Sequence, residues 1–95
     1  MHMHDTINEF RAAMRDAGIT PPNVIETNGQ LHRFHVQGDK PGSRNGYLVL
    51  HLDGRPAGMF GNWKTGLRST WAADGKRMSE AEREAFAKLI EAAKI

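Results

Sequence analysis

The sequence contains no cysteine among its 95 residues. Disulfide bonds, cysteine-ligated metal sites and thiol nucleophiles are therefore excluded. No apolar run approaches the roughly 18 residues that a membrane-spanning helix needs. The first residues, Met1 to Asp5, lack the apolar core of a secretory signal. We therefore expect a cytoplasmic protein that makes no contact with a membrane.

The chain is also short, and its composition is ordinary. Hydrophobic residues make up 39% of it and charged residues 25%, which is typical of a globular domain. This length excludes an enzyme built from a nucleotide-binding domain and a separate substrate domain. Because the sequence shows no internal repeat and no linker, residues 1–95 are expected to form a single small domain.

Two patterns near the ends of the chain predict helices. Thr6 with Glu9, and Ser79 with Glu82, have the spacing of a capping box. Apolar residues recur at helical spacing after each box, and Gly18 stands where a left-handed C-terminal cap is needed. The predicted helices cover residues 5–17 and 79–93.

Between these helices the sequence predicts a β-meander, because short apolar runs alternate with Gly, Asn and Asp. Asp53-Gly54 favours a two-residue type I′ turn, since both residues tolerate positive φ. The expected strands cover residues 31–36, 47–52, 55–60 and 67–72. The prediction is an α+β domain in the order α-β-β-β-β-α, with both helices packed on one face of a four-stranded antiparallel sheet.

Alternation along the predicted strands separates their side chains into two faces. Leu48, Leu50 and Trp71 share one face, which we assign to the core under the two helices. The opposite face is expected to be open to solvent, and it collects Arg33, His35, Tyr47, His51 and Arg68.

Positive charge is concentrated in the predicted sheet. Residues 31–77 carry a net charge of +5, whereas residues 1–30 carry −2 and residues 78–95 carry −1. A basic open sheet with interleaved aromatic rings suits single-stranded DNA or RNA. The expected binding residues are Arg33, His35, Tyr47, Arg55, Trp63, Lys64 and Arg68. The alternative is that these cations keep the surface soluble and protect strand edges, and that the rings belong to the core.

Metal, cofactor and catalytic patterns are absent from the sequence. His32 and His35 have an odd spacing, which places them on opposite faces of a strand and prevents them from sharing a metal ion. The acidic residues of the central region, Asp39, Asp53 and Asp74, stand in turns. We expect no bound metal, no cofactor and no enzymatic activity of the chain itself.

Several segments together suggest a family. They are residues 29–34, 45–50, 53–66 and 70–71, of which Phe60-Gly61-Asn62-Trp63-Lys64-Thr65-Gly66 is the most specific. These segments resemble the N-terminal module of Toprim-type DNA primase/helicase proteins of plasmids, prophages and integrated mobile elements. The resemblance implies a role in the replication or transfer of mobile DNA. Because the chain has no Asp-x-Asp motif to hold magnesium, it also implies that the catalytic core is absent.

Our leading hypothesis from the sequence is a non-catalytic accessory domain that binds nucleic acid, in particular single-stranded DNA, in a primase/helicase. The alternative is a protein-interaction module that docks on the primase/helicase core or another replication protein through the sheet or its edge. The two hypotheses differ in salt dependence, because phosphate contacts release counterions and an apolar docking surface does not.

Overall fold

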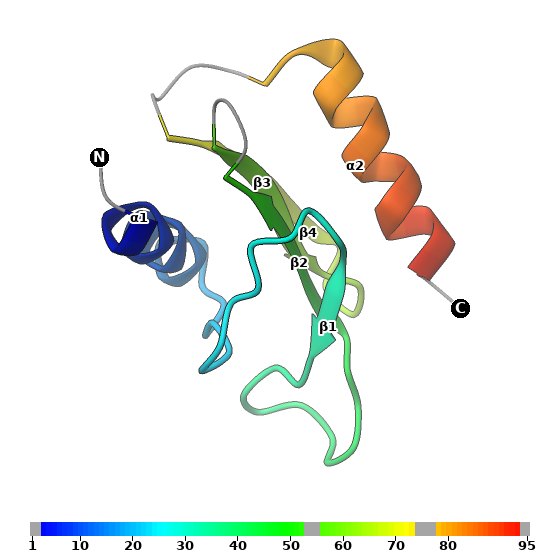
Figure 1. Cartoon of the computed structure of the whole chain (residues 1–95). Helices are drawn as coiled ribbons and strands as arrows, with labels where there is room; N and C mark the ends of the chain where they lie inside the picture. Colours follow the sequence, from blue (N-terminus) through cyan, green and yellow to red (C-terminus); the bar gives the residue numbers. More distant parts are fainter. Residues whose placement is uncertain (1–2, 53–55, 74–77, 94–95) are drawn as a thin grey trace.

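The computed structural model describes residues 3–52, 56–73 and 78–93. Figure 1 shows a sheet that lies between two helices. The four strands are antiparallel and follow one another in the order β1-β2-β3-β4. The α+β class, the order of the elements and the meander are thus confirmed. The elements are α1 (Met3–Asp16), β1 (His32–Phe34), β2 (Gly46–His51), β3 (Ala57–Asn62), β4 (Leu67–Ala72) and α2 (Glu80–Ala93).

The predicted capping box of α2 is confirmed. Ser79 Oγ accepts a hydrogen bond from the Glu82 amide at 3.1 Å, and the Ser79 amide donates to Glu82 Oε1 at 2.9 Å. The box predicted at Thr6 is wrong, because α1 begins at Met3 and Thr6 lies buried inside the helix.

The C-terminal end of α1 has the predicted left-handed cap. Gly18 adopts a φ of 88°, which only glycine takes up without strain. The amide of Ile19 then donates to the Met14 carbonyl at 3.0 Å, and the Gly18 amide donates to the Arg15 carbonyl at 2.9 Å. This is a Schellman motif, and it returns the buried Ile19 side chain to the core.

Strand β2 is buried on both of its faces. Leu48 and Leu50 point toward α1, whereas Tyr47 and Val49 point toward α2, and all four are at most 1% exposed. The pattern of alternation expected from the sequence is therefore correct, but both sets of side chains are core.

The two helices lie on opposite faces of the sheet, as Figure 1 shows with α1 to the left and α2 to the right. The prediction that both helices cover one face is wrong. The physical reason is that Tyr47, Val49 and Met59 make the second face apolar, and the apolar side of α2 is available to cover it.

The core on the α1 side is built around Phe10 and Met14, both fully buried. The Phe10 ring meets Phe60 edge-to-face at 5.6 Å and Trp71 at 5.5 Å. Trp71 is on the predicted face, although it is only half-buried. The spacing pattern in α1 thus identified the helix face that packs on the sheet.

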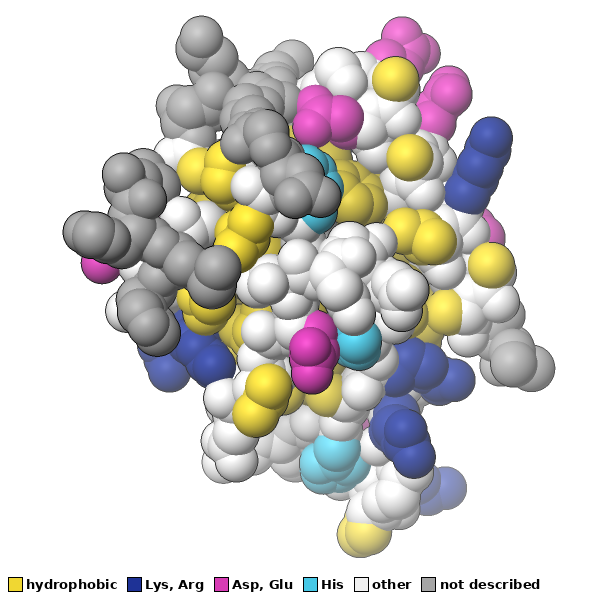
Figure 2. Space-filling view, viewed as in Figure 1, with side chains coloured by type: hydrophobic (Ala, Val, Ile, Leu, Met, Phe, Trp, Pro, Cys, Tyr) yellow, Lys and Arg dark blue, Asp and Glu magenta, His cyan; other side chains and the backbone are white. Residues whose placement is uncertain are grey.

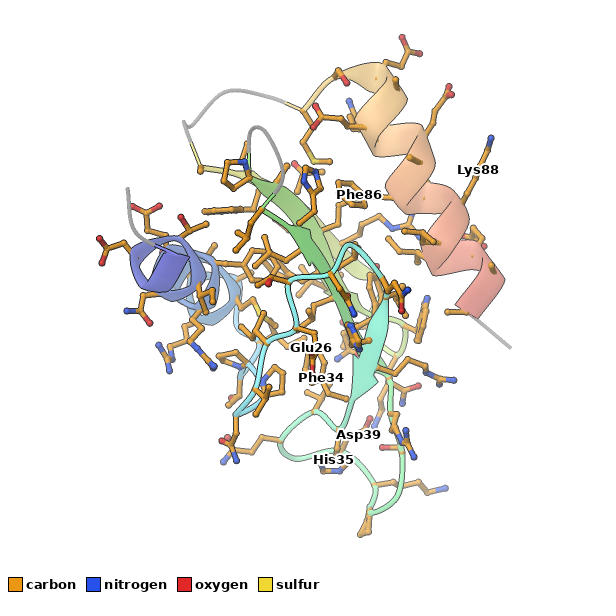
Figure 3. The ribbon with its side chains drawn as sticks, viewed as in Figure 1. Glu26, Phe34, His35, Asp39, Phe86 and Lys88 are labelled. Carbon is orange, nitrogen blue, oxygen red and sulfur yellow. The ribbon has the colours of Figure 1, made fainter. Side chains whose placement is uncertain are left out.

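The core on the α2 side depends on Phe86 and Ile90, which are both buried in one cluster with residues of the sheet. Phe86 points from the helix toward the sheet (Figure 3). His51 stacks on the Phe86 ring at 5.7 Å, so it is not an open-face residue. The helical spacing of apolar residues also predicts that Ala85 and Leu89 lie on the buried side of α2, but both are exposed, Leu89 at 38%.

Glycine in β3 lets neighbouring groups approach the strand from both sides. A Cβ atom on Gly58 would collide with the Val49 carbonyl and touch the Phe10 ring. A Cβ atom on Gly61 would collide with the Leu67 carbonyl and the Tyr47 hydroxyl. The residue type at these positions is therefore fixed by close packing.

Three of the four strands differ in their bounds from the expected ones. The first is shorter than the predicted 31–36, the second covers 46–51 instead of 47–52, and the third covers 57–62 instead of 55–60. The turn predicted at Asp53-Gly54, and Arg55 after it, lie outside the described residues. Within the described residues, neither helix is long and apolar enough to cross a membrane.

We predict that Phe86→Ala lowers the free energy of unfolding by about 3–5 kcal/mol, because it removes the main apolar contact of α2 and leaves a cavity. Urea denaturation followed by circular dichroism measures this change. Lys88→Ala is the matched control, since Lys88 is exposed on the same helix and points away from the sheet (Figure 3). We expect the control to change stability by less than about 0.5 kcal/mol. Equal, small effects of both substitutions would contradict the packing of α2.

Candidate nucleic-acid interface

The predicted open sheet face is covered by α2, and this removes Tyr47 as a base-stacking residue. Its ring is 1% exposed and lies in the core cluster with Phe86 and Ile90. A base cannot stack on a ring that α2 already covers. The assignment of Tyr47 to nucleic-acid binding is therefore wrong.

Trp63 lies at the border of this buried cluster. Its ring centroid is 4.6 Å from that of Tyr47, and the Arg33 guanidinium carbon lies 4.8 Å from the ring. The residue is half-buried, and its Nε1 atom is buried. The Trp63 ring thus makes a cation–π contact with Arg33.

Arg68 is on the predicted face, but its guanidinium makes hydrogen bonds within the domain. Its Nε atom donates to the Tyr47 hydroxyl at 3.3 Å, which raises the pKa of the guanidinium, and Nη2 donates to Glu91 at 3.2 Å. Arg68 therefore links β4 to β2 and α2.

Four exposed cations lie together at one end of the sheet instead. Figure 2 shows Lys and Arg side chains gathered at the lower right, beside the β1–β2 loop of Figure 1. We call this surface the basic end. It is made of Arg33, Lys40, Arg44 and Lys64, which belong to β1, the β1–β2 loop and the β3–β4 turn.

A single carboxylate, Asp39, holds the loops of the basic end together. It accepts hydrogen bonds from Asn45 Nδ2 at 2.9 Å, from Lys64 Nζ at 3.0 Å and from the Lys40 amide at 2.8 Å. These donors, Asn45 first, hold the pKa of Asp39 well below its ordinary value. The Asp39 side chain is 5% exposed, whereas Lys64 is 58% exposed. Asp39 therefore fixes the loop to the turn while most of the surface remains positive.

His35 lies beside Asp39 at the same loop (Figure 3) and also contacts the loop backbone. Its Nε2 atom lies 3.2 Å from the Asp39 carbonyl and 3.0 Å from the Lys40 carbonyl. Because carbonyl oxygens only accept, Nε2 carries the proton in this arrangement. His35 is exposed, but its ring nitrogen is committed to the loop backbone.

The β3–β4 turn presents Lys64 through backbone geometry. Asn62 is buried, and its Oδ1 accepts from the Lys64 amide at 2.9 Å. Gly66 adopts a positive φ of 81°, and its amide donates to the Asn62 carbonyl at 2.9 Å. The Trp63 amide donates to the Asn45 carbonyl at 2.9 Å, which joins this turn to the β1–β2 loop.

The structure thus brings together Arg33, His35, Trp63 and Lys64 of the predicted site. It also adds Lys40 and Arg44 of the β1–β2 loop, which were not among the predicted site residues. Two cations within five residues of a Gly-rich loop were the available signal. No group of three or more His, Asp or Glu residues in the described part of the chain could hold a metal ion.

Most of this chain is similar to a segment of a much longer protein. It is 39% identical over 90 residues to DNA primase TraC of Escherichia coli. The matched segment covers 86% of this chain and 8% of that protein. A second DNA primase TraC of Escherichia coli is 40% identical over 80 residues, covering 79% of this chain and 6% of that protein. The chain therefore spans less than a tenth of either relative. No family model and no solved structure matches it.

We predict that Asp39 stabilises the fold at neutral pH and loses this effect in acid. Because its pKa is lower in the folded than in the unfolded chain, protons bind the unfolded chain first as the pH falls past the ordinary value of 3.8. The free-energy difference between wild type and Asp39→Asn should therefore shrink from about pH 6 to about pH 3. Urea denaturation at a series of pH values measures it.

Glu26→Gln is the control for this series, since Glu26 is an exposed carboxylate in the α1–β1 connection. Its difference from wild type should vary less with pH. A constant difference for Asp39→Asn over the whole range would show that the carboxylate does not hold the loop.

Proposed function

We propose that this chain is an accessory nucleic-acid-binding domain of a DNA primase, and that it contacts phosphates through the basic end. The premise is that most of the chain is similar to a segment of DNA primase TraC. The observation that carries the proposal is the Asp39 network. It joins two loops so that Arg33, Lys40, Arg44 and Lys64 present charged groups on one surface.

The geometry of the basic end favours the chain of phosphates in a nucleic acid over a single small anion. Its cations are spread along a strand, a loop and a turn, which matches the repeated charges of a nucleic-acid backbone. Arg33 is positioned by the Trp63 ring and by donating through Nε to the Arg44 carbonyl at 3.1 Å. Lys40 and Arg44 are exposed at the loop itself.

The burial of Tyr47 changes the expected mode of binding. Base stacking now rests on Trp63 alone among the proposed site residues, and Trp63 is half-buried. We therefore propose that phosphate contacts supply most of the affinity and that a preference for single-stranded DNA comes from the flexibility of the strand. The relation to a Toprim primase/helicase, and the absence of catalysis by the chain itself, are part of the same proposal.

We predict that a labelled single-stranded oligonucleotide binds the domain with micromolar affinity at low salt and that added salt weakens binding steeply. Fluorescence anisotropy at several salt concentrations measures this, and duplex DNA of the same sequence tests strand preference. The variant Lys40→Ala/Arg44→Ala should weaken binding about tenfold and reduce the salt slope by about 1–2, because it removes phosphate contacts.

Arg15→Ala/Lys88→Ala is the matched control, because it removes the same charge from exposed positions on α1 and α2. We expect it to retain most of the affinity. Equal weakening by both double variants would mean that net charge, and not the basic end, drives binding. No binding at low salt would overturn the proposed function and favour a protein partner.

A further inference from the structure

The two edges of the sheet differ in how much backbone they expose. Strand β1 forms one edge with only three residues, and Gly29 and Asn28 before it extend the pairing toward β2. Strand β4 forms the other edge with six residues in uninterrupted register with β3. Only β4 therefore offers a full-length edge within the described residues.

The register identifies which backbone groups of β4 face outward. The Ala73 amide donates to the Pro56 carbonyl, so the hydrogen-bonded pairs with β3 alternate from there and include Trp71 and Ser69. The remaining residues of the strand, Arg68, Thr70 and Ala72, direct their N–H and C=O groups to the free edge. Within the described part of the chain, no other strand pairs with this edge.

Strand β4 also lacks the devices that normally protect an open edge. Its sequence, Leu-Arg-Ser-Thr-Trp-Ala, contains no proline and no lysine, and the register shows no bulge. Its one charged side chain, Arg68, is held by Tyr47 and Glu91. An edge of this kind is suited to pairing with a further strand.

A groove of about 760 Å³ runs between this edge and α2. Its helical wall is a single stripe of α2, and the stripe carries both signs of charge, with Arg83 between two acids. The stripe consists of Glu80, Arg83, Glu84 and Ala87.

We propose that the edge of β4 binds a second copy of this chain, so that two β4 strands pair antiparallel about a two-fold axis at Thr70. Thr70 would then pair with Thr70 of the second copy, and Arg68 with Ala72. The same axis runs the two α2 helices antiparallel on one face of the joined sheet. Their mixed-charge stripes are self-complementary, because Arg83 of one copy can meet Glu84 of the other.

Size exclusion with light scattering tests this proposal, with Thr70→Pro and Thr70→Ala as a matched pair. Thr70→Pro removes the outward N–H and no hydrogen bond of the β3–β4 pair, whereas Thr70→Ala keeps that N–H. We expect wild type and Thr70→Ala to have the mass of two chains at high micromolar concentration, and Thr70→Pro to have the mass of one.

Thr70→Lys is a second variant that keeps the test decisive if the proline variant fails to fold. It places two like charges directly opposite each other across the axis, which disfavours pairing. It should be monomeric with an unchanged circular dichroism spectrum. The proposal is overturned if wild type is monomeric throughout the concentration range, or if Thr70→Lys remains dimeric.

Discussion

The fold depends on the burial of strand β2 on both of its faces. Tyr47 and Val49 on one side, and Leu48 and Leu50 on the other, are all removed from solvent, so each face of the sheet needs its own apolar cover. One helix of this length cannot cover both faces. The chain therefore places α1 and α2 on opposite sides, and each helix contributes its own aromatic anchor, Phe10 or Phe86, to a separate core.

This two-sided cover decides which parts of the sheet remain exposed. With both faces of the sheet occupied, its exposed parts are the loops at its ends and its outer edges. The β1–β2 loop and the β3–β4 turn meet at one end, where Asp39 and the Trp63 amide tie them together. The Asp39 carboxylate accepts hydrogen bonds from Lys64, Asn45 and the loop backbone, and it is almost removed from solvent. The exposed charge of that end therefore remains positive.

The proposed interactions use different parts of the molecule. The basic end and the β4 edge are formed by different side chains. The β3–β4 turn, which carries Lys64, connects the two surfaces. A pair of chains joined through β4 would present two basic ends to one nucleic acid. Linking two weak phosphate sites in this way raises the overall affinity without any new contact.

The fold class, the order of the elements and most local features follow from the sequence alone. These local features depend only on neighbours in the chain and were therefore predictable. They are the capping box at Ser79, the cap at Gly18, the positive φ at Gly66 and the alternation along β2. The faces of the sheet covered by the helices were decided only by the tertiary structure. An alternating strand pattern shows which side chains share a face, but not which distant helix covers that face. The assembly of the basic end also depends on the tertiary structure, since Asp39 and Lys64 are far apart in sequence and meet only when the β1–β2 loop folds onto the β3–β4 turn.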